Sequence, residues 1–117
     1  MTTTADILTA ARQTITDPNR WTQKALARDK HNRWQNPGSP QAVCWCAEGA
    51  IELAAINLKT RPSLQQLAVT AVSKSASTLH GVDIRSLNDV TAWRPETTHQ
   101  AVLNVFDHAI EQQEKTR

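Results

Sequence analysis

The segment from Pro40 to Leu58 constrains the fold more than any other part of the sequence. It is the most hydrophobic stretch of the chain, and many of its apolar side chains share helical spacing. Ser39 followed by Pro40 is typical of a helix start, because the hydroxyl caps the first turn and the missing proline N–H costs nothing there. We therefore expect a central, mostly buried helix over residues 40–58, which would contain Cys44, Trp45 and Cys46.

Three further segments, over residues 3–16, 62–81 and 97–110, place apolar side chains at helical spacing. The charged residues 111–117 are expected to fray. A chain of 117 residues has the length of one domain with one hydrophobic core. We predict a mainly α fold, a small four-helix orthogonal bundle that forms a single domain over residues 1–117.

Polar residues near the expected helix starts support two of these boundaries. Thr3 and Asp6 have the spacing of a capping box, in which each side chain accepts a hydrogen bond from the backbone N–H of the other residue. Ser63 and Gln66 repeat this spacing after Pro62. Both pairs indicate helix N-termini.

Two connections between the expected helices lack a regular spacing of apolar residues. Residues 19–38 include an Asp-Lys-His-Asn group in which Asn32 can adopt the positive φ of a tight turn. This connection is expected to be a long loop or a short two-stranded β-hairpin. Residues 82–94 are irregular, and Ser86 and Asp89 are placed to cap one short turn there.

Composition excludes some classes of protein. Glu48 and Glu52 interrupt the most apolar segment, so no run approaches the roughly 18 apolar residues of a membrane span. The N-terminus lacks the basic and apolar regions of a secretory signal, which predicts a cytoplasmic protein. A disulfide between Cys44 and Cys46 would close a strained ring, and we expect two free thiols.

Several short motifs are similar to those of one protein family. They are Trp21-Thr22-Gln23, Arg28-Asp29, Ala42-Val43-Cys44-Trp45-Cys46-Ala47 with Gly49-Ala50, Leu87-Asn88-Asp89, and a last helix with Val102. This pattern resembles an uncharacterised family of short bacterial and phage proteins, a domain of unknown function. The resemblance implies a phage or mobile-element setting and supplies no mechanism.

Cys46 is the candidate nucleophile. Thiol hydrolases combine a cysteine with a histidine base and an orienting amide or carboxylate. The residues available for these roles are His80, His99, His108, Asn88 and Asp89. The expected helix places Cys46 nearly two turns from its N-terminus, beyond the first turn where the helix dipole lowers a thiol pKa. We therefore predict no catalytic residue, with a cysteine-dependent hydrolase or transferase as the alternative.

Metal binding is not expected. On a helix, Cys44 and Cys46 would point about 200° apart and would not share one ion. His99 and His108 are nine residues apart, which places them on opposite faces of the last helix. The sequence predicts neither a metal site nor a cofactor.

The aromatic residues favour a binding function. Four of the five are tryptophan, and Trp21, Trp34 and Trp93 lie outside the expected helices. Trp and Arg are favoured in protein interfaces, so these tryptophans with Arg28 and Arg33 are the predicted partner-binding residues. We expect a small non-enzymatic interaction or accessory protein that binds a protein partner.

A nucleic-acid-binding module is the other alternative. Segment 20–34 interleaves tryptophans with the basic residues Arg20, Lys24, Arg28, Lys30 and Arg33. Such a segment combines charges that neutralise phosphates with surfaces on which bases stack. The net charge of the whole chain, +2, does not favour nucleic acid by itself.

Overall fold

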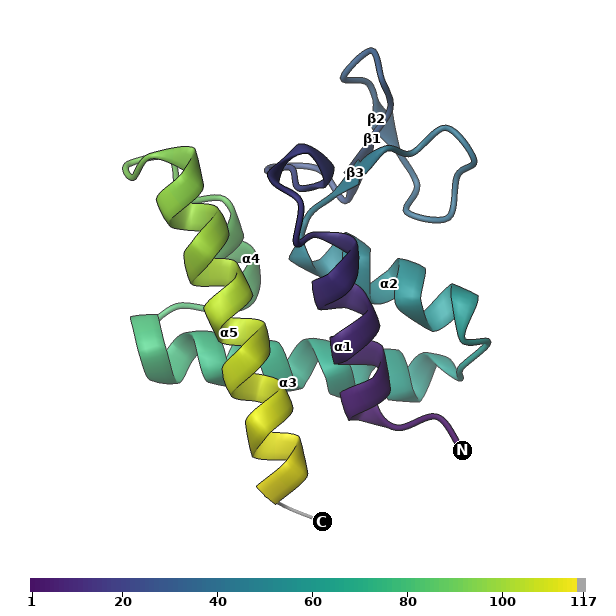
Figure 1. The fold of residues 1–117 in the computed structure, drawn as a ribbon, viewed down its shortest axis with the longest axis vertical. Helices are drawn as coiled ribbons and strands as arrows, with labels where there is room; N and C mark the ends of the chain where they lie inside the picture. Colours follow the sequence, from purple (N-terminus) through teal and green to yellow (C-terminus); the bar gives the residue numbers. More distant parts are fainter. Residues whose placement is uncertain (116–117) are drawn as a thin grey trace.

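A computed structural model describes residues 1–115 and shows a mainly helical protein (Figure 1). Its helices are α1 (Thr4–Thr14), α2 (Ala47–Asn57), α3 (Pro62–His80), α4 (Ile84–Asn88) and α5 (Pro95–Lys115), with a 3-10 turn η1 (Pro18–Arg20). Its strands are β1 (Ala27–Arg28), β2 (Trp34–Gln35) and β3 (Cys44–Trp45). The mainly α class is confirmed, whereas a strict four-helix bundle is not, because α4 and a small sheet are added to the four long helices.

The hydrophobic core lies between the four long helices. α1 packs against α2, α3 and α5, and α3 crosses both α1 and α5 (Figure 1). The largest fully buried side chains include Phe106, Ile7, Leu8 and Ile51. Within residues 1–115, no helix combines the length and the hydrophobicity needed to cross a membrane.

The expected helix over residues 40–58 is wrong in its first part. Ser39 does begin a turn, since its hydroxyl accepts a hydrogen bond from the Gln41 N–H at 3.2 Å. The chain then pairs with β1 instead of coiling, and the Cys46 N–H donates to the Leu26 carbonyl at 3.1 Å. Helix α2 therefore starts only at Ala47, and hydrogen bonds to a distant strand override the local helix signal.

Of the two structures expected for the first connection, it forms the short β-hairpin, and a third strand from the segment expected to be helical joins it. β1 pairs antiparallel with both β2 and β3, in the order β2-β1-β3. Asn32 has a φ of 65°, so it takes the expected left-handed conformation in the turn. The sheet stands at one end of the molecule, beside the N-terminus of α2 (Figure 1).

The structure contains one of the two capping boxes that the sequence predicts. The Thr3–Asp6 capping box is confirmed, with hydrogen bonds of 2.9 and 3.2 Å. The Ser63–Gln66 box is wrong, because Arg61 is the N-cap of α3 and its side chain makes no capping bond. Pro62 occupies the first turn there and needs no N–H partner.

Two later boundaries also differ from expectation. The N-cap of the short helix α4 is Asp83, which accepts from the Ser86 N–H at 2.8 Å, and not Ser86, whereas Asp89 does cap the helix, at its C-terminus. Helix α5 starts at Pro95, two residues before the expected position, and runs to Lys115. An ion pair of 3.1 Å between Lys115 and Glu111 supports its last turn, and the rest of the expected frayed segment, residues 116–117, lies outside the described residues.

Candidate functional site

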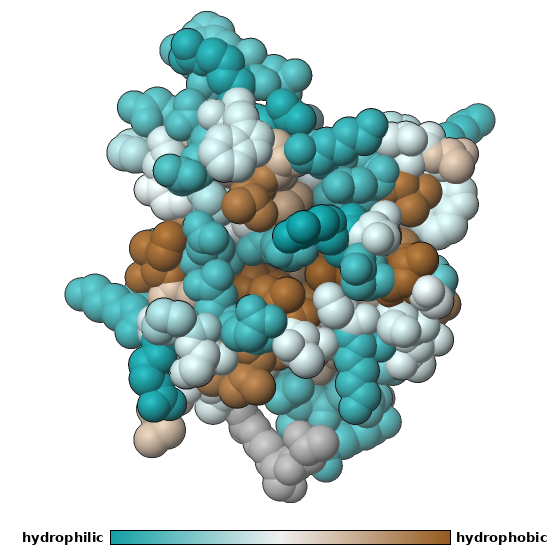
Figure 2. All heavy atoms as spheres, turned by 180° about the vertical axis from the view of Figure 1, so that it is seen from behind, coloured by the Kyte–Doolittle hydropathy of each residue, from teal (hydrophilic) through white to brown (hydrophobic). Residues whose placement is uncertain are grey.

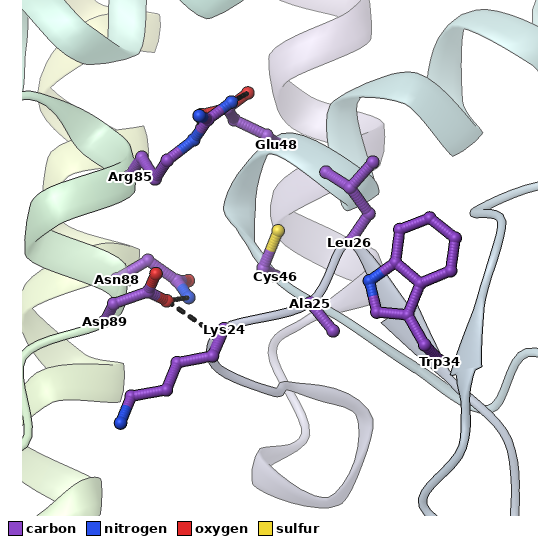
Figure 3. A pocket seen from close by; sticks show the side chains of 9 residues that line it. All are labelled: Lys24, Ala25, Leu26, Trp34, Cys46, Glu48, Arg85, Asn88 and Asp89. Carbon is purple, nitrogen blue, oxygen red and sulfur yellow. Dashed lines mark hydrogen bonds and ion pairs between the residues drawn. The ribbon is translucent and has the colours of Figure 1, made fainter.

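A cleft of about 260 Å³ opens between the small sheet, the N-terminus of α2 and helix α4 (Figure 3). Its lining residues come from three distant parts of the sequence: Lys24, Ala25, Leu26, Trp34, Cys46, Glu48, Arg85, Asn88 and Asp89. We call it the Trp34 cleft. Clefts with a few convergent polar groups are the usual location of binding sites.

Asn88 joins the walls of the cleft. Its Oδ1 accepts hydrogen bonds from Trp21 Nε1 at 2.8 Å and from the Ala47 N–H at 3.1 Å. Its Nδ2 donates to the Thr22 carbonyl and to Asp89 Oδ1, both at 3.1 Å. The side chain is buried and fully hydrogen-bonded. The hydrogen bonds of Asn88 therefore hold the first connection, α2 and α4 together.

Asp89 fixes the neighbouring backbone. Its Oδ1 accepts from the Lys24 N–H at 2.8 Å, and Lys24 has a φ of 63°. Gln23 Nε2 adds hydrogen bonds to the carbonyls of Asn88 and Val90, at 3.0 and 2.8 Å. These bonds stabilise an unusual conformation of a lysine and hold residues 23–24 against α4.

Glu48 and Arg85 close the cleft on a further side. The guanidinium donates to both carboxylate oxygens, at 3.0 and 3.1 Å, in the bidentate geometry typical of strong Arg–carboxylate pairs. The hydrogen bond and the charge of Glu48 raise the pKa of Arg85. Figure 3 shows this pair on one side of Cys46, with Trp34 lying across from Asn88 and Asp89.

Cys46 is the N-cap of α2, and the predicted position inside a helix is wrong. Its Sγ accepts a hydrogen bond from the Gly49 N–H at 3.3 Å. Burial nevertheless raises the pKa of the Cys46 thiol to about 11. The group at the helix N-terminus is thus a neutral thiol at physiological pH, which is a poor nucleophile.

Cys44 and Cys46 are both free and half-buried. They lie in extended chain, where residues two apart point to the same side, so the expected opposite directions on a helix are wrong. Of the two, Cys46 lines the Trp34 cleft. Across residues 1–115, no cluster of three or more His, Cys, Asp or Glu side chains could hold a metal ion.

The candidate histidine bases lie away from Cys46. His99 is buried, donates from Nε2 to the Ile15 carbonyl, 2.6 Å away, and packs on Trp21. His108 Nδ1 lies 2.8 Å from the Ser75 hydroxyl oxygen, and His80 packs on Trp93. No histidine lines the Trp34 cleft. The structure brings Asn88 and Asp89 to the cleft that Cys46 lines, but it brings none of the candidate histidines there.

The structure does not bring the predicted partner-binding tryptophans to one surface. Trp21 is held by Asn88, while Trp93 lies by His80 in a separate hollow between the end of α3 and the start of α5. Trp45 is buried as expected, although in a strand, and its Nε1 donates to the Pro37 carbonyl. Trp34 is 58% exposed, and its indole N–H has no hydrogen-bond partner in the described part of the chain.

The two predicted arginines make bonds within the hairpin. Arg28 donates to the Thr22 hydroxyl and to the carbonyls of Asn32 and Gln23, at 3.2 to 3.3 Å. Arg33 pairs with the buried Asp29 at 2.9 Å and remains 71% exposed. Both guanidinium groups therefore stabilise the hairpin that carries Trp34.

Glu48 and Arg85 are cleft residues that the sequence did not indicate, and Lys24 was named only as part of the basic segment of the nucleic-acid alternative. Glu48 and Arg85 are 37 residues apart, and no local pattern links them. Gly49 gave a signal, because a glycine inside an apolar helix indicates close approach of another group. A Cβ at this position would lie 1.9 Å from the Leu26 carbonyl oxygen, which is how closely the sheet approaches α2.

Comparison with protein-family models identifies the chain as a member of DUF6197, a family of unknown function, whose model matches residues 1–112. The chain belongs to this family, and the expected membership of a family of unknown function is confirmed. No curated protein and no solved structure matches it.

Proposed function

We propose that this member of a family of unknown function is a small binding protein, without catalytic activity of its own, that holds a protein partner at the Trp34 cleft. The observation that carries this proposal is the position of Trp34, which lies exposed beside a hollow with hydrogen-bonded walls. Exposed tryptophans beside such hollows are typical binding hot spots.

Within residues 1–115 the indole of Trp34 makes neither a hydrogen bond nor a ring contact, whereas each of the other three tryptophans makes at least one of these. Trp21 and Trp45 each use their indole N–H in a hydrogen bond within the chain. Trp34 presents both an apolar ring and a free N–H donor, and both gain favourable contacts when a partner covers them.

The chemistry of Cys46 supports a binding function over a hydrolase. An attacking cysteine needs a thiolate and a base, whereas Cys46 has a raised pKa and no histidine beside it in the cleft. Its sulfur instead caps α2. A setting in a phage or another mobile element, and a cytoplasmic location, stay predictions.

Site-specific photo-crosslinking tests the proposal. One variant carries p-benzoylphenylalanine in place of Trp34, and the matched control carries it in place of Leu67, which is 56% exposed on α3. Each variant is irradiated in the cells that naturally make the protein, and adducts are identified by mass spectrometry. We expect a discrete protein adduct from position 34 and none of that mass from position 67.

The same experiment has clear contrary outcomes. Equal adducts from both positions would indicate random collisions, and no adduct from position 34 would contradict binding at the cleft. A nucleic-acid adduct from position 34 would favour the nucleic-acid alternative.

A further inference from the structure

The three-stranded sheet has one covered edge and one open edge. At the β3 edge, the Thr22 N–H donates to the Trp45 carbonyl at 3.0 Å, and Trp21 bridges to Trp45. β2 forms the other edge, and Trp34 and the preceding turn are exposed there. An open edge offers unpaired backbone groups to another chain.

The hydrogen-bond pattern gives the direction of the Trp34 backbone. The Asp29 N–H donates to the Arg33 carbonyl, while the Arg28 carbonyl accepts from Val43 on the side of β3. Along an antiparallel strand, the N–H and C=O groups of successive residues point alternately toward one neighbouring strand and toward the other. Trp34 is the register partner of Arg28, whose backbone groups point away from β2. The N–H and C=O of Trp34 therefore point away from β1, toward the open edge.

The charge of the hairpin favours an acidic occupant. Residues 24–35 contain four basic side chains and one acidic side chain, a net charge of +3, whereas the whole chain has a net charge of +2. Asp29, the one carboxylate, already accepts bonds from Arg33 and Gln35. Figure 2 shows the hairpin end, at the top of the view, as mostly hydrophilic, with apolar patches below it.

A peptide fits these features better than a nucleic acid or a second copy of the chain. Arg28 and Arg33 are engaged inside the hairpin, which leaves Lys24 and Lys30 as its basic side chains without a hydrogen bond in the described residues. A net charge of +3 is small for a nucleic-acid interface, which neutralises several phosphates. A second copy of the chain would place its own hairpin, also with a net charge of +3, against this edge, and the two like charges would repel each other.

We propose that β2 receives an extended acidic segment of the protein partner as an added strand. The partner's backbone would pair with the N–H and C=O of Trp34, and its carboxylates would lie near Lys24 and Lys30. One of its side chains would enter the Trp34 cleft beside the indole. Strand addition of this kind takes affinity from the backbone and specificity from the pocket. This inference rests on the proposed function and names the chemistry of the partner.

A phage-displayed library of random nine-residue peptides, selected on the full-length protein, supplies the probe. We expect enrichment of Asp and Glu among the selected peptides. The best peptide is then synthesised, and hydrogen exchange of the Trp34 amide is measured by NMR in the free and bound protein. Pairing at the edge should slow this exchange at least about tenfold.

Two pairs of variants test the backbone and the charge separately. Trp34→Pro and Trp34→Ala both lose the indole, but only the proline also loses the outward N–H, so we expect it to bind the peptide about five- to tenfold more weakly than the alanine variant. Lys30→Glu should weaken binding several-fold, whereas Lys74→Glu on α3 should not change it.

The outcomes separate this inference from the proposed function. A peptide that requires the Trp34 ring but leaves its amide exchange unchanged would overturn strand addition and leave binding at the cleft intact. Selection of no peptide, or of peptides without acidic residues, would also overturn the inference, and the crosslinking result would still decide the proposed function. Salt-sensitive binding of a 20-nucleotide oligothymidylate in competition with the peptide would contradict both.

Discussion

The indole N–H of Trp21 donates to the side-chain oxygen of Asn88 at 2.8 Å, across 67 residues of sequence. The same oxygen accepts the N–H of Ala47 in the first turn of α2. One buried amide thus connects three segments that line the Trp34 cleft. Its geometry makes the shape of the cleft a property of the folded core and not of a loose connection.

Removal of this amide should destabilise the whole fold. Asn88→Ala leaves the Trp21 and Ala47 donors and the Thr22 carbonyl without their partner, and we expect a loss of about 2–4 kcal/mol in the free energy of unfolding. Urea unfolding, monitored by circular dichroism, measures this free energy. Asn104→Ala, which removes an exposed hydrogen bond within α5, is the control and should cost less than about 0.5 kcal/mol. Equal effects of the two substitutions would contradict the role given to Asn88.

The close approach of the sheet to α2 predicts a second loss of stability. In Gly49→Ala the new methyl group would lie 1.9 Å from the Leu26 carbonyl oxygen, so the sheet must move, at a cost of about 3 kcal/mol, the upper end of the usual range for overpacking. Gly81→Ala is the matched control, because that glycine has open space around it and only its φ of 76° opposes a side chain, which costs about 1 kcal/mol. Thermal unfolding of both variants checks the order, and a Gly49→Ala protein as stable as Gly81→Ala would disprove the close packing.

Asp29 should make the hairpin sensitive to acid. The hydrogen bond from the Arg33 N–H is the main cause that lowers the pKa of this carboxyl, and Gln35 and His31 add to it. Because the pKa is lower in the folded than in the unfolded chain, the stabilisation is present above about pH 4 and is lost as the pH falls toward the folded pKa.

The variant Asp29→Asn isolates this effect. The difference in unfolding free energy between wild type and Asp29→Asn should shrink between pH 6 and pH 2, as measured by urea unfolding at each pH. Asp83, whose pKa is also lowered, is present in both proteins and cancels in the difference. A difference that stays constant over this range would rule out a paired Asp29 carboxylate.

Cys46 should react slowly with thiol reagents. Its pKa of about 11, raised from 9.0 by burial, leaves only about one thiol in ten thousand ionised at pH 7. In a Cys44→Ser background, we expect iodoacetamide to label Cys46 about 100-fold more slowly in the native protein than in the urea-unfolded chain. The rate should rise with pH up to about pH 11. Rapid labelling near pH 7 would instead make Cys46 an activated nucleophile and favour the hydrolase.

Local patterns predicted the elements that depend on local contacts. The Thr3–Asp6 box, the third helix with Gly81 at its end and the positive φ of Asn32 are all set within a few residues of sequence. The start of α2 could not be found in this way. Ser39-Pro40 is a valid local start signal, but the hydrogen bond between Cys46 and Leu26 joins residues that only the folded sheet brings together.

In the candidate site, too, residue types could be recognised locally, whereas roles that depend on distant contacts could not. Asn88, Asp89 and Cys46 were identified from their residue types, and the structure does bring them to one cleft. Their roles were not predictable, because three of the four hydrogen-bond partners of the Asn88 side chain are 41 to 67 residues away. Trp34 was predicted to contact a partner, as were Trp21 and Arg28, but spacing alone could not show that the latter two make bonds within the chain.

Isothermal titration calorimetry of the partner found by crosslinking tests the central claim most directly. Wild type, Trp34→Ala and Leu67→Ala are titrated under the same conditions, and circular dichroism confirms that each is folded. We predict that Trp34→Ala weakens binding at least about 30-fold, since hot-spot residues contribute 2 kcal/mol or more, whereas Leu67→Ala stays within about twofold of wild type. A Trp34→Ala protein that binds the partner as tightly as wild type would contradict the account.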